Sequence, residues 1–246
     1  YGFNFVQLPP SLAPNDTAAD SNSTGFPGVR SAQATALPRP GGPTDATSMA
    51  VTIDLGGKSA WGFLHPPNKT EVARRLALAT IHATYGTQNE GSGSKFWTGP
   101  VALSATYTGS ESVVLRFEQG TANHINLQAV PNCTRCCPSA TNVTGAVTPF
   151  EIWVGAAWEP TVPSISDSTL VFRSPDLSAA SRIRFGGTDF IECALYNDQQ
   201  LPMAPFDLPI QRVPKDESND AAPTLSTQGM PLAPPLGFYA WTYYRW

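Results

Sequence analysis

One of the three histidines in this 246-residue chain has neighbours that suit acid–base catalysis. Asp54 lies near the end of an apolar, strand-like run, SMAVTIDL, and a glycine-rich loop then leads to His65, which two prolines follow. A histidine held rigidly at a strand end can act as the general base for a serine, and a carboxylate can fix its tautomer and stabilise the imidazolium. The sequence therefore predicts His65 as a catalytic base and Asp54 as its orienting acid, with a loop-lining or helix-capping histidine as the alternative.

The serine that such a histidine would serve is not evident in the chain. A nucleophilic serine of this kind sits on a sharp strand-to-helix turn between glycines. None of the candidates has that setting: Ser31, Ser48, Ser59, Ser92 and Ser94. The other two histidines, His82 and His124, have no motif around them, and we interpret both as structural.

Strand–loop–helix units are expected in the first part of the chain. Residues 3–8 and 48–55 are short apolar runs that predict buried strands, and residues 28–37 could form a short helix that ends before Pro38. This alternation is typical of α/β architecture and extends to about residue 90.

The strongest helix prediction begins at Asn68, which can act as N-cap. Glu71 then occupies N3 of a capping box, and Gly86 suits the position just past the C-terminal end. Four apolar residues recur on one face at helical spacing: Val72, Leu76, Ala79 and Ala83.

The pattern changes after the polar segment 89–95. Short strand-like runs follow within residues 91–208, separated by turn residues at intervals typical of a β-sandwich. We predict four parts: an α/β part over 1–90, a β-sandwich domain over 91–208, a proline-rich linker over 209–230, and an aromatic tail over 231–246.

Sequons and cysteines indicate the secretory pathway, so that the protein would be secreted, lysosomal or at the cell surface. The N-x-S/T sequons predict glycosylation at Asn15, Asn22, Asn68, Asn132 and Asn142. The cysteines are Cys133, Cys136, Cys137 and Cys193. A metal site would need paired ligand spacings, so we favour disulfides and expect one residue of the CTRCC group to pair with Cys193.

Composition excludes several classes of function. Charged residues make up 14% of the chain and the net charge is -4, so no basic surface for nucleic acid is indicated. No apolar run is long enough to span a membrane, and no cofactor or metal site is predicted. The first residues, YGFNFVQLPP, do not resemble a signal peptide, so we expect that a signal was removed or that the chain begins within a larger one.

Several blocks of the sequence resemble the sialate O-acetylesterases and related bacterial carbohydrate acetylesterases. The block SMAVTIDL…FLHPPNKTEVARRLAL is similar to their M-A-V-x-x-D run, variable loop and H-P-x-[ND]-K-x-x-V-x-x-R-L motif. GFPGVRSAQ resembles their W-P-x-x-R-x-A-Q helix, with Arg30 and Gln33 in register. FVQLPP and RFGGTDFIECALYNDQQLPMAPF resemble their substrate-side strand and C-terminal signature, so the similarity spans roughly residues 3–208.

The resemblance implies the C-terminal part of an SGNH-type, flavodoxin-like hydrolase domain that removes O-acetyl groups from sugars through a serine acyl-enzyme. Many SGNH enzymes place the aspartate three residues before the histidine, a position that Gly62 occupies here. Either Asp54 serves from further back, or the site works as a Ser-His dyad supported by a backbone carbonyl. The family's serine and oxyanion donors precede the strand at residues 3–8, so we expect them on an N-terminal partner fragment or subunit.

Two alternatives remain. The chain could instead be a non-catalytic structural or glycan-binding module of a larger extracellular glycoprotein, and a glycan on Asn68 would crowd His65. The tail, MPLAPPLGFYAWTYYRW, resembles the start of an alpha-galactosidase domain, or else forms an aromatic terminal strand that packs on the β-domain.

Overall fold

The computed structural model describes residues 2–10, 25–37, 47–62, 64–85, 97–109, 111–131, 133 and 148–212. The chain divides into two units, Tyr1–Val213 and Pro214–Trp246, and every described residue belongs to the first. Several predictions therefore lie outside the described residues: the aromatic tail, the boundary segment 89–95, Ser92, Ser94, Cys136, Cys137 and the sequons at Asn15, Asn22, Asn132 and Asn142.

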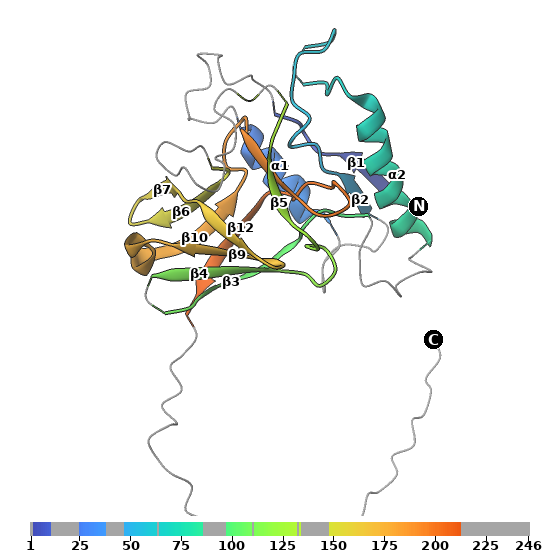
Figure 1. Cartoon of the computed structure of the whole chain (residues 1–246). Helices are drawn as coiled ribbons and strands as arrows, with labels where there is room; N and C mark the ends of the chain where they lie inside the picture. Colours follow the sequence, from blue (N-terminus) through green and yellow to red (C-terminus); the bar gives the residue numbers. More distant parts are fainter. Residues whose placement is uncertain are drawn as a thin grey trace, which may run out of the picture. The chain divides into compact units, whose positions relative to one another are not determined.

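The first part of the chain forms the predicted α/β layer. Strand β1 (Phe3–Val6) pairs in parallel with β2 (Thr47–Ala50), helix α1 (Phe26–Thr35) lies between them in sequence, and α2 (Lys69–Tyr85) packs against both strands (Figure 1). Because the strands are parallel, their carboxyl ends meet at one edge, where α/β folds place their sites. The predicted alternation of strands and helices is confirmed here.

Helix α2 has the predicted N-cap, but the side chain of its first acidic residue, Glu71, binds arginines of the same helix. The Asn68 side-chain oxygen accepts a hydrogen bond from the Glu71 backbone N–H at 3.1 Å, which confirms the N-cap. The Glu71 carboxylate binds Arg74 and Arg75, one turn further along the helix. Ala79 of the predicted apolar face is buried, and so is Arg75, which the apolar pattern did not predict.

The second half of the described chain forms one eight-stranded sheet in the order β7-β6-β10-β12-β3-β4-β9-β8. A separate two-stranded ribbon pairs β5 (Asn126–Ala129) with β11 (Cys193–Tyr196). The strands of the large sheet are β3 (Ala102–Tyr107), β4 (Ser112–Phe117), β6 (Phe150–Val154), β7 (Ala157–Pro160), β8 (Pro163–Ser166), β9 (Thr169–Arg173), β10 (Ala180–Phe185) and β12 (Phe206–Gln211), with a 3-10 turn, η2, at Pro175–Ala179.

The β-rich character of this half agrees with the sequence, but the predicted β-sandwich is not confirmed. The strand-like runs predicted in this half, which begin near residues 101, 112, 150, 168 and 181, appear as β3, β4, β6 with β7, β9 and β10. Strand β12 continues through Pro209 to Gln211, into the segment expected to begin a linker. Pro209 pairs with Arg182 of β10, and the next residues of β12 pair with β3 instead, so the proline lies where the strand changes partner.

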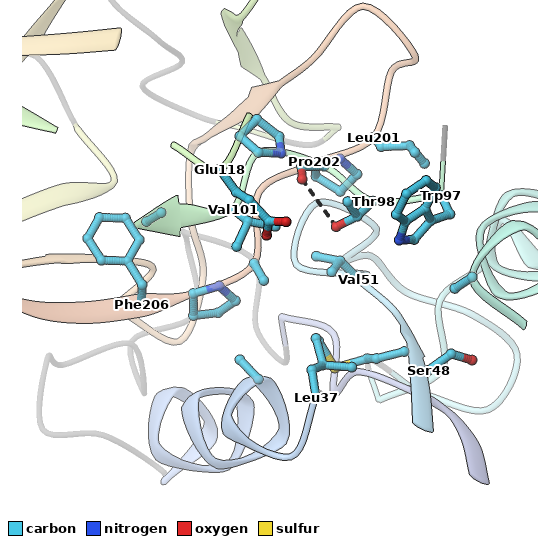
Figure 2. A pocket seen from close by; sticks show the side chains of 18 of the residues that line it. Leu37, Ser48, Val51, Trp97, Thr98, Val101, Glu118, Leu201, Pro202 and Phe206 are labelled. Carbon is cyan, nitrogen blue, oxygen red and sulfur yellow. Dashed lines mark hydrogen bonds between the residues drawn. The ribbon is translucent and has the colours of Figure 1, made fainter. Parts of the chain in front are cut away.

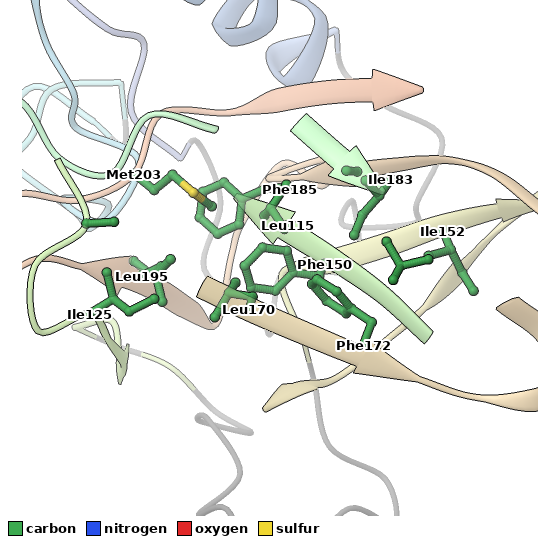
Figure 3. Close-up of a cluster of buried hydrophobic side chains, with 14 of the residues drawn as sticks. Leu115, Ile125, Phe150, Ile152, Leu170, Phe172, Ile183, Phe185, Leu195 and Met203 are labelled. Carbon is green, nitrogen blue, oxygen red and sulfur yellow. The ribbon is translucent and has the colours of Figure 1, made fainter. Parts of the chain in front are cut away.

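A single hydrophobic core joins the two halves. Phe150 lies near the centre of this core, 5.4 Å from Phe172 and 5.2 Å from Phe185 between ring centroids (Figure 3). Ile53, from the segment that follows β2, is fully buried in the same cluster. The α/β layer is therefore anchored to the sheet by apolar packing.

Neither Cys133 nor Cys193 is a free thiol. Cys136 and Cys137, the other residues of the CTRCC group, lie outside the described residues, so the disulfide pairing stays a prediction.

Within the described ranges, no helix is long and apolar enough to cross a membrane.

Replacement of Gly186 tests the contact between the two halves. Gly186 has φ +73°, and a Cβ there would lie 2.7 Å from the Ile53 side chain. Gly186→Ala should lower the free energy of unfolding by about 2–4 kcal/mol, the sum of backbone strain and overpacking. Gly155→Ala, at a similar φ of +63° with open space around it, should cost only about 1 kcal/mol. Equal losses in urea denaturation would contradict the proposed contact.

Candidate active site

The loop from β2 to α2 carries both residues predicted to do chemistry. Asp54 lies near its start and is buried, with 3% exposure, whereas His65 lies near its end and is exposed. No hydrogen bond or ion pair connects His65 to Asp54 among the described residues. The structure therefore places the two residues on one loop without bringing their side chains into contact.

The Asp54 carboxylate is bound by two other residues. Arg75 of α2 donates from both terminal nitrogens, at 2.6 Å to Oδ1 and 2.8 Å to Oδ2. The hydroxyl of Tyr196, at the end of β11, donates to Oδ2 at 2.8 Å. Such a bidentate, charge-assisted pair fixes geometry strongly when it is buried. We call these three residues the Asp54 network.

Arg75 is also bound at its other donors. It donates to the Val51 carbonyl at 2.8 Å and to Glu71 at 2.7 Å. Burial alone would lower the pKa of Arg75, but the hydrogen bonds and negative charges of Asp54 and Glu71 outweigh burial and raise it. The arginine therefore remains a cation that joins the end of β2 to the first turn of α2.

Tyr196 connects this pair to the second half of the chain. Burial, reinforced by the charge of Asp54 and the hydrogen bond to it, raises the pKa of the Tyr196 hydroxyl far above its ordinary value. The hydroxyl therefore stays protonated and acts as a donor. Through this bond, strand β11 helps to fix the position of the loop between β2 and α2.

The part of the loop before His65 is shaped by a tight turn. Ser59 and Gly62 exchange two backbone hydrogen bonds of 3.2 Å, and Gly62 has φ +89°. After His65, Pro66 is buried and α2 begins at Lys69. The exposed imidazole thus lies between a closed turn and a buried proline, beyond the carboxyl ends of β1 and β2.

Helix α1 holds neighbouring segments in place through two polar residues. The side chain of Gln33 accepts a hydrogen bond from the Leu8 N–H at 2.8 Å and donates to the Val6 carbonyl at 3.4 Å. Arg30 is completely buried and donates to the carbonyls of Thr188 and Asp189. Burial, opposed by the charge of Asp189, lowers the pKa of Arg30 to about 10.

Two of the serines that lack a nucleophile's setting, and the sequon in this region, have structural contacts. Ser48 donates to the Asn4 side chain at 2.6 Å, and Ser59 donates to the Gly62 carbonyl at 2.9 Å. The Asn68 oxygen caps α2, as described above. Whether Asn68 carries a glycan stays a prediction.

A cavity of about 800 Å³ lies between the α/β layer and the sheet (Figure 2). Leu37, Ser48 and Val51 line one side, and Val101 and Phe206 line the other. Neither His65 nor Asp54 is among its described lining residues, but Val51 at the start of the β2–α2 loop and Arg75 of the Asp54 network are, so the cavity borders the network and not the histidine.

Sequence reasoning missed the partners of Asp54. Arg75 could have been suspected, because it lies on the apolar face of α2 and four residues after Glu71. Tyr196 carried no comparable signal, since nothing local relates residue 196 to residue 54. Gln7 was also missed: it is buried at the end of β1, and its side-chain amide has no hydrogen-bond partner among the described residues.

Comparisons with known proteins agree with this geometry. No family model matches the chain. It is 28% identical, over 221 residues and 84% of its length, to the sialate O-acetylesterases of Mus musculus and Rattus norvegicus. It is also similar in structure to a carbohydrate acetylesterase from Xanthomonas citri, with a TM-score of 0.58, 29% identity and 84% of the chain covered.

The fold is thus a mixed α/β fold that matches a carbohydrate acetylesterase. Within that class, the homologues found by sequence are sialate O-acetylesterases, which confirms the family resemblance predicted from the sequence blocks. The chain spans 35% of the length of these curated relatives and 40% of the solved Xanthomonas citri chain.

Removal of the Arg75 charge tests the Asp54 network. Arg75→Met leaves a buried carboxylate without its cation and should lower the free energy of unfolding by about 3–5 kcal/mol. Its neighbour Arg74 is the matched control, since it is largely exposed and pairs with Glu71 on the surface. Arg74→Met should cost at most about 1 kcal/mol. Similar small losses for both variants in urea denaturation would show that the network is not structural.

The pH dependence of stability tests Glu71. The hydrogen bond from Arg74, opposed by partial burial and assisted by Arg75, lowers the pKa of Glu71. A carboxyl whose pKa is lower in the folded state stabilises the fold above its unfolded pKa and loses this effect as pH falls through the folded pKa. Wild type should therefore exceed Glu71→Gln by roughly 0.5–1 kcal/mol at pH 7, and the difference should disappear in acid. A difference that does not change with pH would contradict this assignment.

Proposed function

We propose that this chain is the C-terminal part of a carbohydrate O-acetylesterase of the sialate type and that it supplies the general base, His65. In this proposal the nucleophilic serine and the oxyanion donors lie on an N-terminal fragment or subunit. The substrate is an O-acetyl ester of a sugar, and no cofactor takes part.

The observation that carries the proposal is the placement of His65. Its exposed imidazole lies on a loop held by the buried Asp54 network at one end and by buried Pro66 at the other. The loop follows a parallel strand, at the edge where α/β enzymes assemble their sites. Catalysis requires this kind of support, because a base must be held within a fraction of an ångström of its working position.

The proposed reaction has two steps. His65 accepts the serine hydroxyl proton while the serine oxygen bonds to the acetyl carbon, and the imidazolium then returns the proton to the sugar oxygen as the ester bond breaks. A water molecule next loses a proton to His65 and attacks the acyl-enzyme, and the imidazolium returns that proton to the serine oxygen as the acyl–serine bond breaks. The products of the cycle are the de-acetylated sugar and acetic acid, and the serine and the neutral His65 are regenerated.

Asp54 has two proposed roles that differ in their test. As a triad acid it would bind His65 directly, which requires the loop to move, since its carboxylate binds Arg75 and Tyr196 here. As a positioning residue it would act through the loop, and the imidazole would be oriented by a backbone carbonyl. Both roles predict that Asp54→Asn lowers the melting temperature, because it leaves Arg75 as a buried cation without its carboxylate. Only the first role also predicts a large loss of kcat in Asp54→Asn that Arg75→Met, which keeps the carboxylate, does not share.

The cellular setting belongs to the same proposal. Five sequons support passage through the secretory pathway, and the absence of free thiols among the described cysteines is consistent with an oxidising compartment. We place the protein outside the cell, at its surface or in the lysosome, with disulfides in the β-rich half.

Two observations favour a second candidate function. Among the described residues no carboxylate binds His65, and the Asn68 sequon lies three residues away. The alternative is a non-catalytic structural or glycan-binding module of a larger extracellular glycoprotein. The two candidates differ in whether purified material contains a segment bearing a G-x-S serine and an oxyanion asparagine.

Acetate release by the purified full protein tests the role of His65. His65→Ala should lower kcat for an O-acetylated sugar roughly 10²–10⁴-fold, because it removes the general base. The fold should be unaffected, because His65 is exposed. The matched control is His124→Asn, which changes another exposed histidine and suits the left-handed φ of +46° there. The control should retain wild-type activity. Unchanged acetate release in His65→Ala would contradict the base assignment, and inactive wild-type protein would contradict the esterase proposal.

A further inference from the structure

Trp61 is the most exposed large apolar side chain among the described residues, with 80% of its surface accessible. It lies four residues before His65 on the same loop, and Leu64, directly before the histidine, is 49% exposed. An exposed indole forgoes the stabilisation that burial of a large side chain brings. Trp61 and Leu64 thus expose apolar surface on the loop that carries the proposed catalytic base, and loops on a rigid scaffold are where binding residues concentrate.

The turn that carries Trp61 is fixed by its own hydrogen bonds. The backbones of Ser59 and Gly62 bond to each other twice, the Ser59 hydroxyl donates to the Gly62 carbonyl, and the Trp61 N–H donates to that hydroxyl at 3.1 Å. The left-handed φ of Gly62 lets the chain close the turn. The indole is thus presented on a backbone that is already ordered, which reduces the entropy lost on binding.

The rest of the loop anchors this turn to the protein. Gly56 is buried, and a Cβ there would lie 3.0 Å from Pro10 and 3.3 Å from Phe190. Asp54 and Pro66 are buried on either side. Figure 1 shows this segment, in cyan to teal, extending beyond the start of α2. Trp61 and His65 therefore belong to one supported, solvent-facing stretch of chain.

We propose that Trp61 is a sugar-binding residue that stacks on the ring of the acetylated substrate and so determines specificity for a carbohydrate ester. The inference rests on the proposed function for its substrate class. A flat aromatic face on a polar surface suits a ligand that has an apolar ring face and polar edges, as a pyranose does. Stacking would place the sugar within reach of His65 without a hydrogen bond from the indole.

A protein partner is the competing occupant, and the loop composition argues against it. Stable protein interfaces bury about 800 Å² on each side around a closely packed apolar centre. Apart from Leu64, the described residues close to Trp61 in sequence are small or charged: Lys58, Ser59, Ala60 and Gly62. The apolar area of one indole in such surroundings is enough to cover a sugar ring, but it is small compared with the apolar centre of a stable protein interface.

The test compares a sugar ester with an ester that has no ring, using the full protein. Trp61→Ala should raise KM for 9-O-acetyl-N-acetylneuraminic acid about tenfold and leave kcat/KM for ethyl acetate unchanged. Trp61→Phe should restore most of the loss, because it keeps an aromatic face. Binding of the de-acetylated methyl glycoside, followed by saturation-transfer NMR, should weaken in Trp61→Ala in parallel.

The matched control is Tyr85→Ala. Tyr85 is 74% exposed but lies at the far end of α2, about 24 Å along the helix from its start. This control should change neither KM nor glycoside binding. Equal losses on both esters in Trp61→Ala, or a wild-type KM with wild-type glycoside binding, would overturn the proposal. If wild type binds the glycoside through Trp61 but releases no acetate, the esterase proposal fails and the sugar-binding role of Trp61 stands.

Discussion

The buried contact of Asp54 with Arg75 and Tyr196 sets the geometry on which the rest of the site depends. Its members come from the loop after β2, the first turns of α2 and the end of β11, and Tyr196 lies 142 residues after Asp54. Burying a charge pair costs several kcal/mol of desolvation unless the remaining donors and acceptors also find partners. Here Arg75 finds them in Val51 and Glu71, so the pair can fix the register of α2 against β2.

That register determines where the loop that carries His65 begins and ends. The loop leaves the network at Asp54 and returns at α2, whose N-cap, Asn68, lies three residues after His65. Its two anchors therefore belong to elements held by the same buried arginine. A change in the packing of α2 would move the imidazole without touching it, as expected when a site is built on the ends of rigid elements.

Local patterns in the sequence predicted local structure well, and contacts across the chain poorly. Apolar runs and capping residues predicted the presence of β1, α1, β2 and α2, although β1 ends at Val6 and β2 at Ala50, short of the predicted ends. Strand β11, by contrast, is buried at every position and shows no alternation of apolar and polar residues. Strand β12 contains Pro209, and a proline argues against predicting a central strand. Strand spacing cannot distinguish a β-sandwich from one eight-stranded sheet, and helical periodicity does not predict that a charged residue, Arg75, occupies the buried face.

The same contact also defines what Asp54 can do for His65. A carboxylate has about four acceptor positions, and Arg75 and Tyr196 use three of them, two on Oδ2 and one on Oδ1. One position on Oδ1 is left, so capacity does not prevent a bond from the imidazole; position does, because Asp54 is buried and His65 is exposed. An aspartate needed to hold α2 could approach the histidine only by weakening the pair that supports the loop. This conflict favours a division of roles, in which Asp54 places the loop and a backbone carbonyl orients the imidazole.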